Sequence, residues 1–170
     1  SFFHAAEAGA SFALIGHSEQ RYVFGMQTED IQKAYSAACV AGLRPVLCVG
    51  ETRAERDAGM TESVVRSQVR DILSKTNSTV SPIIAYEPVW AISHGGVGEA
   101  CSPDMAKEVL SHLHSEAPGL PILYGGSVQA KDIPVFVGGK DGFDGVLVGH
   151  ASTTLDGFES ILQAFSFGSI

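Results

Sequence analysis

The stretch Pro82-Ile83-Ile84-Ala85-Tyr86-Glu87-Pro88-Val89-Trp90 decides the fold, because in it an unbroken apolar run ends at a single carboxylate. A run that is continuously apolar, rather than alternating with polar residues, is typical of a parallel strand buried on both faces. Further runs of this kind occur at residues 12–15, 45–49, 121–124 and 146–148. Together with residues 82–86 they predict buried parallel strands and an α/β fold.

The segments between these runs carry helix signals. Ser102 and Pro103 supply a cap and a first-turn proline, and Met105, Val109 and Leu113 then recur on one helical face. Strand and helix alternate at the length of a βαβ element, and no linker or low-complexity tract interrupts them. We therefore expect residues 1–170 to form one continuous domain.

Composition excludes several classes of function. The formal net charge of -8 argues against a nucleic-acid partner, because phosphate-backbone binding needs clustered lysine and arginine. Cys39, Cys48 and Cys101 are odd in number and show no metal-site spacing, which predicts neither a disulfide framework nor a zinc site. No apolar run approaches the length of a membrane span, and no export signal is apparent. We expect a cytoplasmic protein without a membrane partner.

Polar residues and glycines gather where the apolar runs stop. These clusters are Gly16-His17-Ser18, Gly50-Glu51, Glu87, Gly125-Gly126-Ser127 and Gly149-His150. In parallel α/β folds ligands bind at the carboxyl ends of the strands, so we expect the clusters to share one site. The pattern alone suits a flavodoxin-like doubly wound sheet as well as part of a barrel.

Two of these residues have a chemical and a structural interpretation. Glu87, walled by apolar groups, suits a proton-abstracting base, but it could equally pair with an arginine or cap a helix. His17 precedes a predicted helix start, which disfavours an added positive charge and keeps the imidazole neutral and able to donate a hydrogen bond. The His17 side chain could instead form hydrogen bonds with buried backbone groups.

Glu19 and Arg21 are most simply an ion pair or members of a buried network.

The glycine-rich segments also have two interpretations. Residues 93–101 follow Glu87 and read as a mobile lid or as a plain surface loop. The clusters at Gly125-Gly126-Ser127 and Gly149-His150 could hold a phosphate through backbone N–H groups and a hydroxyl, or could be tight turns.

Taken together, these residues resemble the triosephosphate isomerase family over essentially the whole chain. The motifs that carry the resemblance are Gly16-His17-Ser18-Glu19, Cys48-Val49-Gly50-Glu51, residues 55–61, residues 85–92, residues 124–128 and Leu147-Val148-Gly149. The motifs around His17 and Glu87 are specific as a pair.

The resemblance implies a (β/α)₈ TIM barrel, of which this chain supplies about five βα units, the family's strands four to eight. It implies the interconversion of dihydroxyacetone phosphate and glyceraldehyde 3-phosphate, with Glu87 as the base, His17 as the neutral electrophile and Glu19 beside them. It also implies that neither a metal nor an organic cofactor is needed, and that the complete protein is a homodimer.

The substrate implied by the resemblance is a small phosphorylated sugar. Residues 88–100 would form the lid over it. The phosphate would be held by Ser93, Ser127, Gly149 and His150.

The sequence departs from the family pattern in ways that bear on catalysis and substrate. The family's Asn-x-Lys motif has no counterpart in these 170 residues, so we expect no useful isomerase activity from this chain alone. Gln20 stands where the family usually has an arginine, and Met26 where it usually has an acidic residue.

Other departures surround the expected phosphate site. The lid is longer than the family's by about three residues, Ser93 replaces a glycine, and His150 replaces the second of two glycines. A β-carbon at His150 would be costly if that position required φ > 0. These changes leave two alternatives open: an isomerase of a related phosphosugar such as a tetrulose phosphate, or a non-catalytic TIM-barrel relative.

Overall fold

The fold is a five-stranded parallel sheet alternating with helices. In this computed structural model, residues 1–76, 79–92, 101–139 and 141–167 are described, with side chains to residue 165. The strands are β1 (Phe12–Ile15), β2 (Arg44–Val49), β3 (Ile83–Tyr86), β4 (Ile122–Tyr124) and β5 (Gly145–Val146). All neighbouring pairs are parallel, and the strands lie side by side in chain order. A doubly wound sheet reverses its strand order, so this order excludes the flavodoxin-like alternative.

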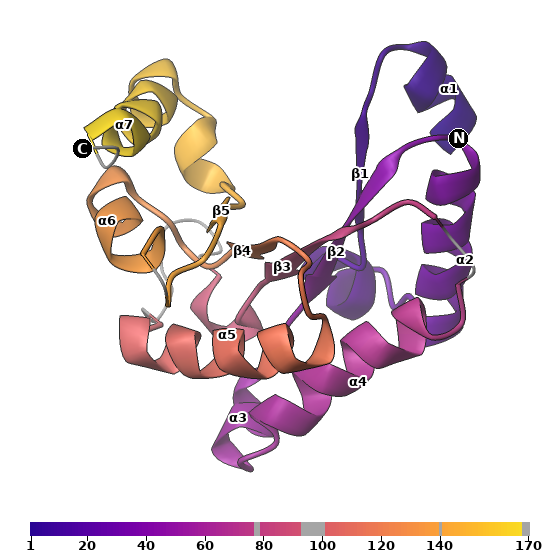
Figure 1. Cartoon of the computed structure of the whole chain (residues 1–170), viewed down its shortest axis with the longest axis horizontal. Coiled ribbons are helices and arrows are strands. Elements are labelled where there is room, and N and C mark those ends of the chain that lie inside the picture. The colour runs from indigo at the N-terminus through magenta and orange to yellow at the C-terminus, as the bar shows by residue number, and fades with distance from the viewer. Residues whose placement is uncertain (77–78, 93–100, 140, 168–170) are drawn as a thin grey trace.

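The sheet curves into an open arc with helices along its outer face. Figure 1 shows α1 and β1 at one end of the arc and α7 at the other. The α-helices are α1 (Phe2–Glu7), α2 (Thr28–Val40), α3 (Arg53–Asp57), α4 (Thr61–Leu73), α5 (Pro103–Glu116), α6 (Ile133–Phe136) and α7 (Leu155–Phe167). The short helices are η1 (Glu19–Val23), η2 (Val89–Ala91), η3 (Ala130–Asp132) and η4 (His150–Ser152). The predicted barrel arc is confirmed.

Local chemistry explains where the helices begin and which face they bury. The Ser102 hydroxyl accepts a hydrogen bond from the Met105 N–H, with Pro103 in the first turn of α5, as predicted. In α4, Val65, Val69 and Ile72 recur at helical spacing, and all three are buried. The core therefore lies between the outer face of the sheet and these helical stripes.

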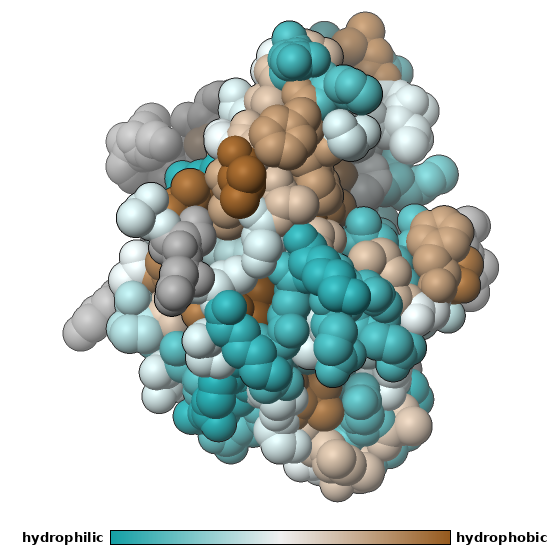
Figure 2. Space-filling model, turned by 90° about the vertical axis from the view of Figure 1, so that its right-hand side faces the viewer, coloured by the Kyte–Doolittle hydropathy of each residue, from teal (hydrophilic) through white to brown (hydrophobic). Residues whose placement is uncertain are grey.

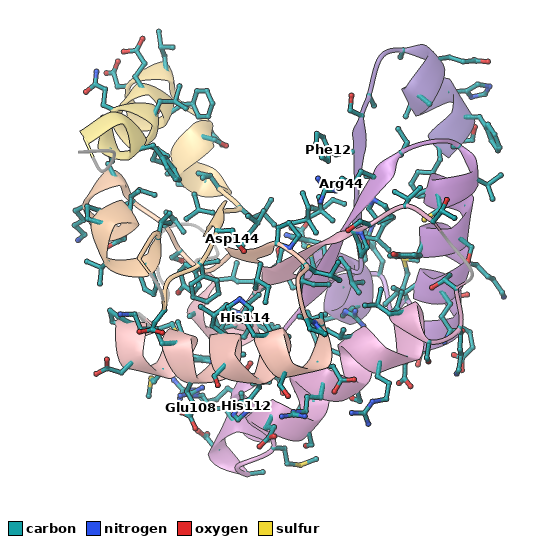
Figure 3. All side chains as sticks on the ribbon, in the orientation of Figure 1. Phe12, Arg44, Glu108, His112, His114 and Asp144 are labelled. Carbon is teal, nitrogen blue, oxygen red and sulfur yellow. The ribbon has the colours of Figure 1, made fainter. Side chains whose placement is uncertain are left out.

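The expectation that every strand is buried on both faces is wrong for β1. Its residues alternate between exposed and buried, with Phe12 at 55% and Leu14 at 40% exposure. Figure 3 shows Phe12 pointing toward the inner, concave side of the arc, where the described residues place no covering layer. The last strand also differs from prediction, since it pairs at Gly145–Val146 rather than at 146–148.

The outer surface is mixed in polarity. Figure 2 views the molecule from the α1 and α2 end and shows apolar side chains gathered in the upper part of this face, above a more hydrophilic region. Phe3 of α1 and Val40 of α2 are among the exposed large apolar side chains. None of the helices in the described ranges is both long and apolar enough to span a bilayer.

Candidate active site

The carboxyl ends of the strands meet around one cavity. Its volume is about 530 Å³, and its lining includes residues that follow β1, β3, β4 and β5. The predicted site residues among the lining are His17, Glu87, Ser127, Gly149 and His150. The sequence-based expectation that the strand-end clusters share one site is therefore met for four of the strands.

Glu87 lies at the end of β3 with its side chain directed toward the end of β1. The residue is buried, and its Oε1 lies 3.1 Å from Nε2 of His17. Its Oε2 accepts a hydrogen bond from the backbone N–H of Ser18 at 3.1 Å. Among the described residues Glu87 forms no ion pair with an arginine, which was one of its structural alternatives, while its contact with Ser18 lies at the start of η1.

Close glycine contacts make room for Glu87. A β-carbon at Gly50 would lie 1.8 Å from the carbonyl oxygen of Glu87, and one at Gly125 would lie 3.0 Å from its Cγ. Only glycine therefore allows the end of β2 to approach the backbone of Glu87 this closely. The backbone N–H of Glu87 donates to the carbonyl of Val49 at 2.7 Å, which fixes the same approach.

Hydrogen bonds around His17 define its tautomer. Nδ1 accepts from the backbone N–H of Glu19 at 3.3 Å, so in the neutral ring the proton lies on Nε2, which faces Glu87. That Nε2 donates to a substrate stays a prediction. The hydrogen bond to Glu87 is also the main cause that raises the pKa of His17 above 6.5, against the lowering effect of burial. Whether the ring is neutral during a reaction stays a prediction.

Glu19 and Arg21 do not form the ion pair considered from the sequence. The Glu19 side chain is 59% exposed, with Oε2 3.9 Å from Nδ1 of His17, and it does not line the cavity. The Arg21 guanidinium instead donates to the carbonyls of Gly16 (2.7 Å) and Cys48 (3.1 Å). Arg21 thereby ties the end of β1 to β2, while a direct role for Glu19 stays a prediction.

Two residues of this region, Gln20 and Cys48, were given no role in the site from the sequence. The Gln20 side-chain oxygen accepts from the backbone N–H groups of Gly16 and His17, at 2.7 and 3.2 Å, and so shapes the loop that carries the imidazole. Cys48 lies beside Glu87, and burial, followed by the charge of Glu87, raises the pKa of its thiol. The position of Cys48 two residues before Gly50 could have suggested this proximity.

A second buried carboxylate anchors the segment after Glu87. Glu51 is fully buried and accepts from Nε1 of Trp90 at 2.8 Å, from the hydroxyl of Tyr86 at 3.2 Å and from Nη1 of Arg56 at 3.2 Å. The guanidinium groups of Arg53 and Arg56 also lie over the Trp90 ring. Glu51 therefore fixes η2, the start of the predicted lid.

The structure describes three of the four residues that were predicted to bind the phosphate, namely Ser127, Gly149 and His150. The Ser127 hydroxyl donates to the carbonyl of Ala91 at 2.8 Å, which links the end of β4 to η2. Ser93 and residues 93–100 of the predicted lid lie outside the described residues. Gly149 and His150 line the cavity, and among the described residues no non-glycine has positive φ. The β-carbon of His150 therefore causes no backbone strain there.

The cavity also includes residues that sequence reasoning missed, namely Gln129, Lys131 and Asp132 from the loop and short helix after β4. Within the described ranges, no cluster of three His, Cys, Asp or Glu residues could hold a metal ion.

Comparison with known proteins identifies the family. A family model described as "Triosephosphate isomerase" matches residues 1–165. The triosephosphate isomerase of Pseudomonas aeruginosa PAO1 is 41% identical over 169 residues, which cover 94% of this chain and 66% of the relative. The triosephosphate isomerase of Alcanivorax borkumensis is 40% identical over 94% of this chain and 67% of the relative. The triosephosphate isomerase of Xanthomonas campestris is 39% identical over 93% of this chain and 65% of the relative. The chain spans about 66% of the length of the first of these relatives. By the family match and these identities, the chain belongs to the triosephosphate isomerase family.

Proposed function

We propose that the intact protein interconverts dihydroxyacetone phosphate and glyceraldehyde 3-phosphate by proton transfer through an enediolate. The observation that carries this proposal is the pairing of Glu87 with His17, 3.1 Å apart, in the cavity at the strand ends. Moving a proton between two carbons next to a carbonyl needs a base on the carbon side and a hydrogen-bond donor at the oxygen. Glu87 and His17 supply one of each.

The geometry suggests how substrate would free the base. Both carboxylate oxygens of Glu87 are occupied, Oε1 facing Nε2–H of His17 and Oε2 accepting from Ser18. A substrate carbonyl that takes the Nε2–H hydrogen bond removes one of these donors from Glu87. The carboxylate then has an unpaired oxygen for proton abstraction, while His17 polarises the carbonyl and stabilises the enediolate oxygen.

The phosphate of the substrate would lie at the β4 and β5 end of the cavity. In the described residues no hydrogen bond involves the backbone N–H of Gly149 or of His150, and these groups are free to bind an anion. The Ser127 hydroxyl would join them after releasing the carbonyl of Ala91. Ser93 and the lid remain part of the proposal on the basis of the family resemblance.

A coupled assay on the intact protein tests the function. We expect turnover of dihydroxyacetone phosphate in the wild type and a fall of about 10²–10⁴-fold in kcat for Glu87→Gln, which removes the base while keeping its shape. Lys107→Met, on the outer face of α5, is a control that should leave kcat unchanged. Wild-type protein without isomerase activity would exclude the proposal and favour the non-catalytic alternative.

The same assay decides between substrates. Three-carbon and four-carbon phosphosugars are compared by kcat/KM, and we expect the three-carbon pair to be faster. A preference for a tetrulose phosphate would contradict the main proposal and support the alternative based on the changes at Ser93 and His150.

We also propose that the intact protein is a homodimer. Tyr22, Val23 and Phe24 are consecutive, apolar or aromatic, and all exposed, directly after the loop that carries His17. An exposed apolar group of this kind is typical of a subunit interface. Sedimentation analysis of the intact protein checks this, and a monomer at micromolar concentration would contradict it. A cytoplasmic location stays a prediction.

A further inference from the structure

The cavity carries a lysine that neither the sequence motifs nor the proposed proton transfer uses. Lys131 lies in η3, after the Gly125–Ser127 turn, and lines the cavity together with His17 and Glu87. Among the described lining residues it is the only lysine or arginine. The side chain is exposed at the rim.

The other charged groups of the lining are already engaged. Glu87 binds His17 and Ser18, and Asp132 Oδ2 accepts from the backbone N–H of Gln129 at 2.9 Å, which closes the turn that begins η3. Within the described part of the chain, no hydrogen bond or ion pair involves the ammonium of Lys131. Neither carboxylate of the lining therefore neutralises Lys131 through an ion pair.

The position of Lys131 matches the phosphate end of the cavity. Residues after β4 and β5 form that end, where Gly149 and His150 offer backbone N–H groups, and η3 packs against α7, which follows β5 in the chain. The formal net charge of the chain is -8, so its overall field repels a phosphate dianion. A local cation at the rim offsets this repulsion and adds a charge-assisted hydrogen bond.

We propose that Lys131 is a phosphate-contacting residue that determines specificity for phosphorylated over unphosphorylated substrates. This rests on the proposed function, since it deepens the account of that site. The ammonium, a compact cation on a flexible stem, reaches the phosphate from the rim and contacts no reacting carbon. Its effect therefore falls on substrate binding rather than on proton transfer.

Steady-state kinetics of the intact protein test this role. Lys131→Met should lower kcat/KM for glyceraldehyde 3-phosphate by roughly tenfold, mainly through KM, because one charge-assisted contact is lost. The same variant should leave kcat/KM for unphosphorylated glyceraldehyde unchanged. Lys131→Arg should restore most of the loss, and Lys107→Met, which removes the same charge outside the cavity, should behave as wild type.

The wild type should also lose more kcat/KM than Lys131→Met as ionic strength rises, because the contact is screened by salt. Equal kcat/KM of wild type and Lys131→Met for the phosphorylated substrate would overturn the proposal, as would an equal loss for both substrates.

Direct binding separates this inference from the proposed function. If the wild type turns over neither substrate, the isomerase proposal fails, and titration calorimetry with inorganic phosphate then tests Lys131 alone. A dissociation constant that rises roughly tenfold in Lys131→Met but not in Lys107→Met supports the anion contact. An unchanged dissociation constant, or no measurable binding of phosphate to the wild type, overturns it.

Discussion

Replacing Gly50 by alanine tests how strongly the close approach of β2 and β3 positions Glu87. The new β-carbon would lie 1.8 Å from the carbonyl oxygen and 2.5 Å from the carbonyl carbon of Glu87. Both obstacles are backbone atoms, which cannot turn aside as a flexible side chain can. The oxygen and the β-carbon must separate by about 1.6 Å, the difference between 1.8 Å and the 3.4 Å at which ordinary contact begins.

A backbone shift of this size is large compared with the stretch that the hydrogen bonds of the Glu87 carboxylate can tolerate. The distances from Glu87 to Nε2 of His17 and to the N–H of Ser18 are both 3.1 Å, so the carboxylate loses one or both when its backbone moves away. A misplacement of about 1 Å costs on the order of 10²-fold in rate. Forcing the extra carbon into a packed site costs about 1–3 kcal/mol of stability.

Three measurements on Gly50→Ala follow from this. We expect kcat/KM to fall about 100-fold and the free energy of unfolding in urea to fall by about 1–3 kcal/mol. We also expect the pKa of His17, followed by NMR, to fall below its wild-type value. The hydrogen bond to Glu87 is the largest cause that raises this pKa, and burial, which remains, lowers it. The NMR result does not depend on the proposed activity.

Gly42→Ala is the matched control. Gly42 follows α2 with φ of +79°, and a β-carbon there meets no atom within 4 Å. Alanine should therefore cost about 1 kcal/mol of stability through backbone strain alone, with kcat/KM and the pKa of His17 unchanged. If Gly50→Ala keeps the wild-type pKa of His17, or loses no more activity than Gly42→Ala, the close approach does not position Glu87.

Two further predictions concern the buried carboxylates. Because the pKa of His17 is raised from 6.5 in the folded state, the pair with Glu87 stabilises the fold fully below pH 6.5 and less as the pH rises through the folded value. The difference in unfolding free energy between wild type and His17→Gln should therefore shrink from acid to alkaline pH, and a pH-independent difference would contradict this. Glu51→Gln leaves the Arg56 guanidinium without its anion and should cost about 3 kcal/mol in urea unfolding. Trp90, the one tryptophan of the sequence, reports this by fluorescence, and a loss confined to experimental error would refute the assignment.

The strands could be predicted because burial on both faces of a sheet leaves an unbroken apolar run in the sequence. A continuous apolar run indicates a buried parallel strand, and this prediction placed β2 and β3 within one residue. It failed on the inner face of β1, where Phe12 and Leu14 are exposed. Burial of that face depends on what lies across the arc, and local composition does not contain this information.

The shared site could be predicted, but its internal geometry could not. The distance between His17 and Glu87 depends on two successive registers, in which Ile15 pairs with Leu47 and Val49 with Tyr86. A shift of one residue in either would separate the two side chains. The requirement for glycine at position 50 is likewise visible only once the backbone of Glu87 is placed opposite it. Lys131 was not predicted for a similar reason. Nothing in the sequence near Lys131 shows that η3 lies beside the cavity, and only the folded chain brings the two together.

Glu51 and Glu87 show why the sequence alone could not assign chemistry to a carboxylate. Both follow a strand of the same sheet, and both are buried. Glu51 is paired with a permanent cation, Arg56, and accepts from two further donors, Tyr86 and Trp90, so its carboxylate is held in place as an anchor. Glu87 forms no ion pair with lysine or arginine among the described residues, and its partner is His17, whose hydrogen bond a substrate oxygen would take in the proposed reaction. The difference between an anchor and the proposed base therefore lies in whether the partner can be displaced, which depends on the packing around each strand end.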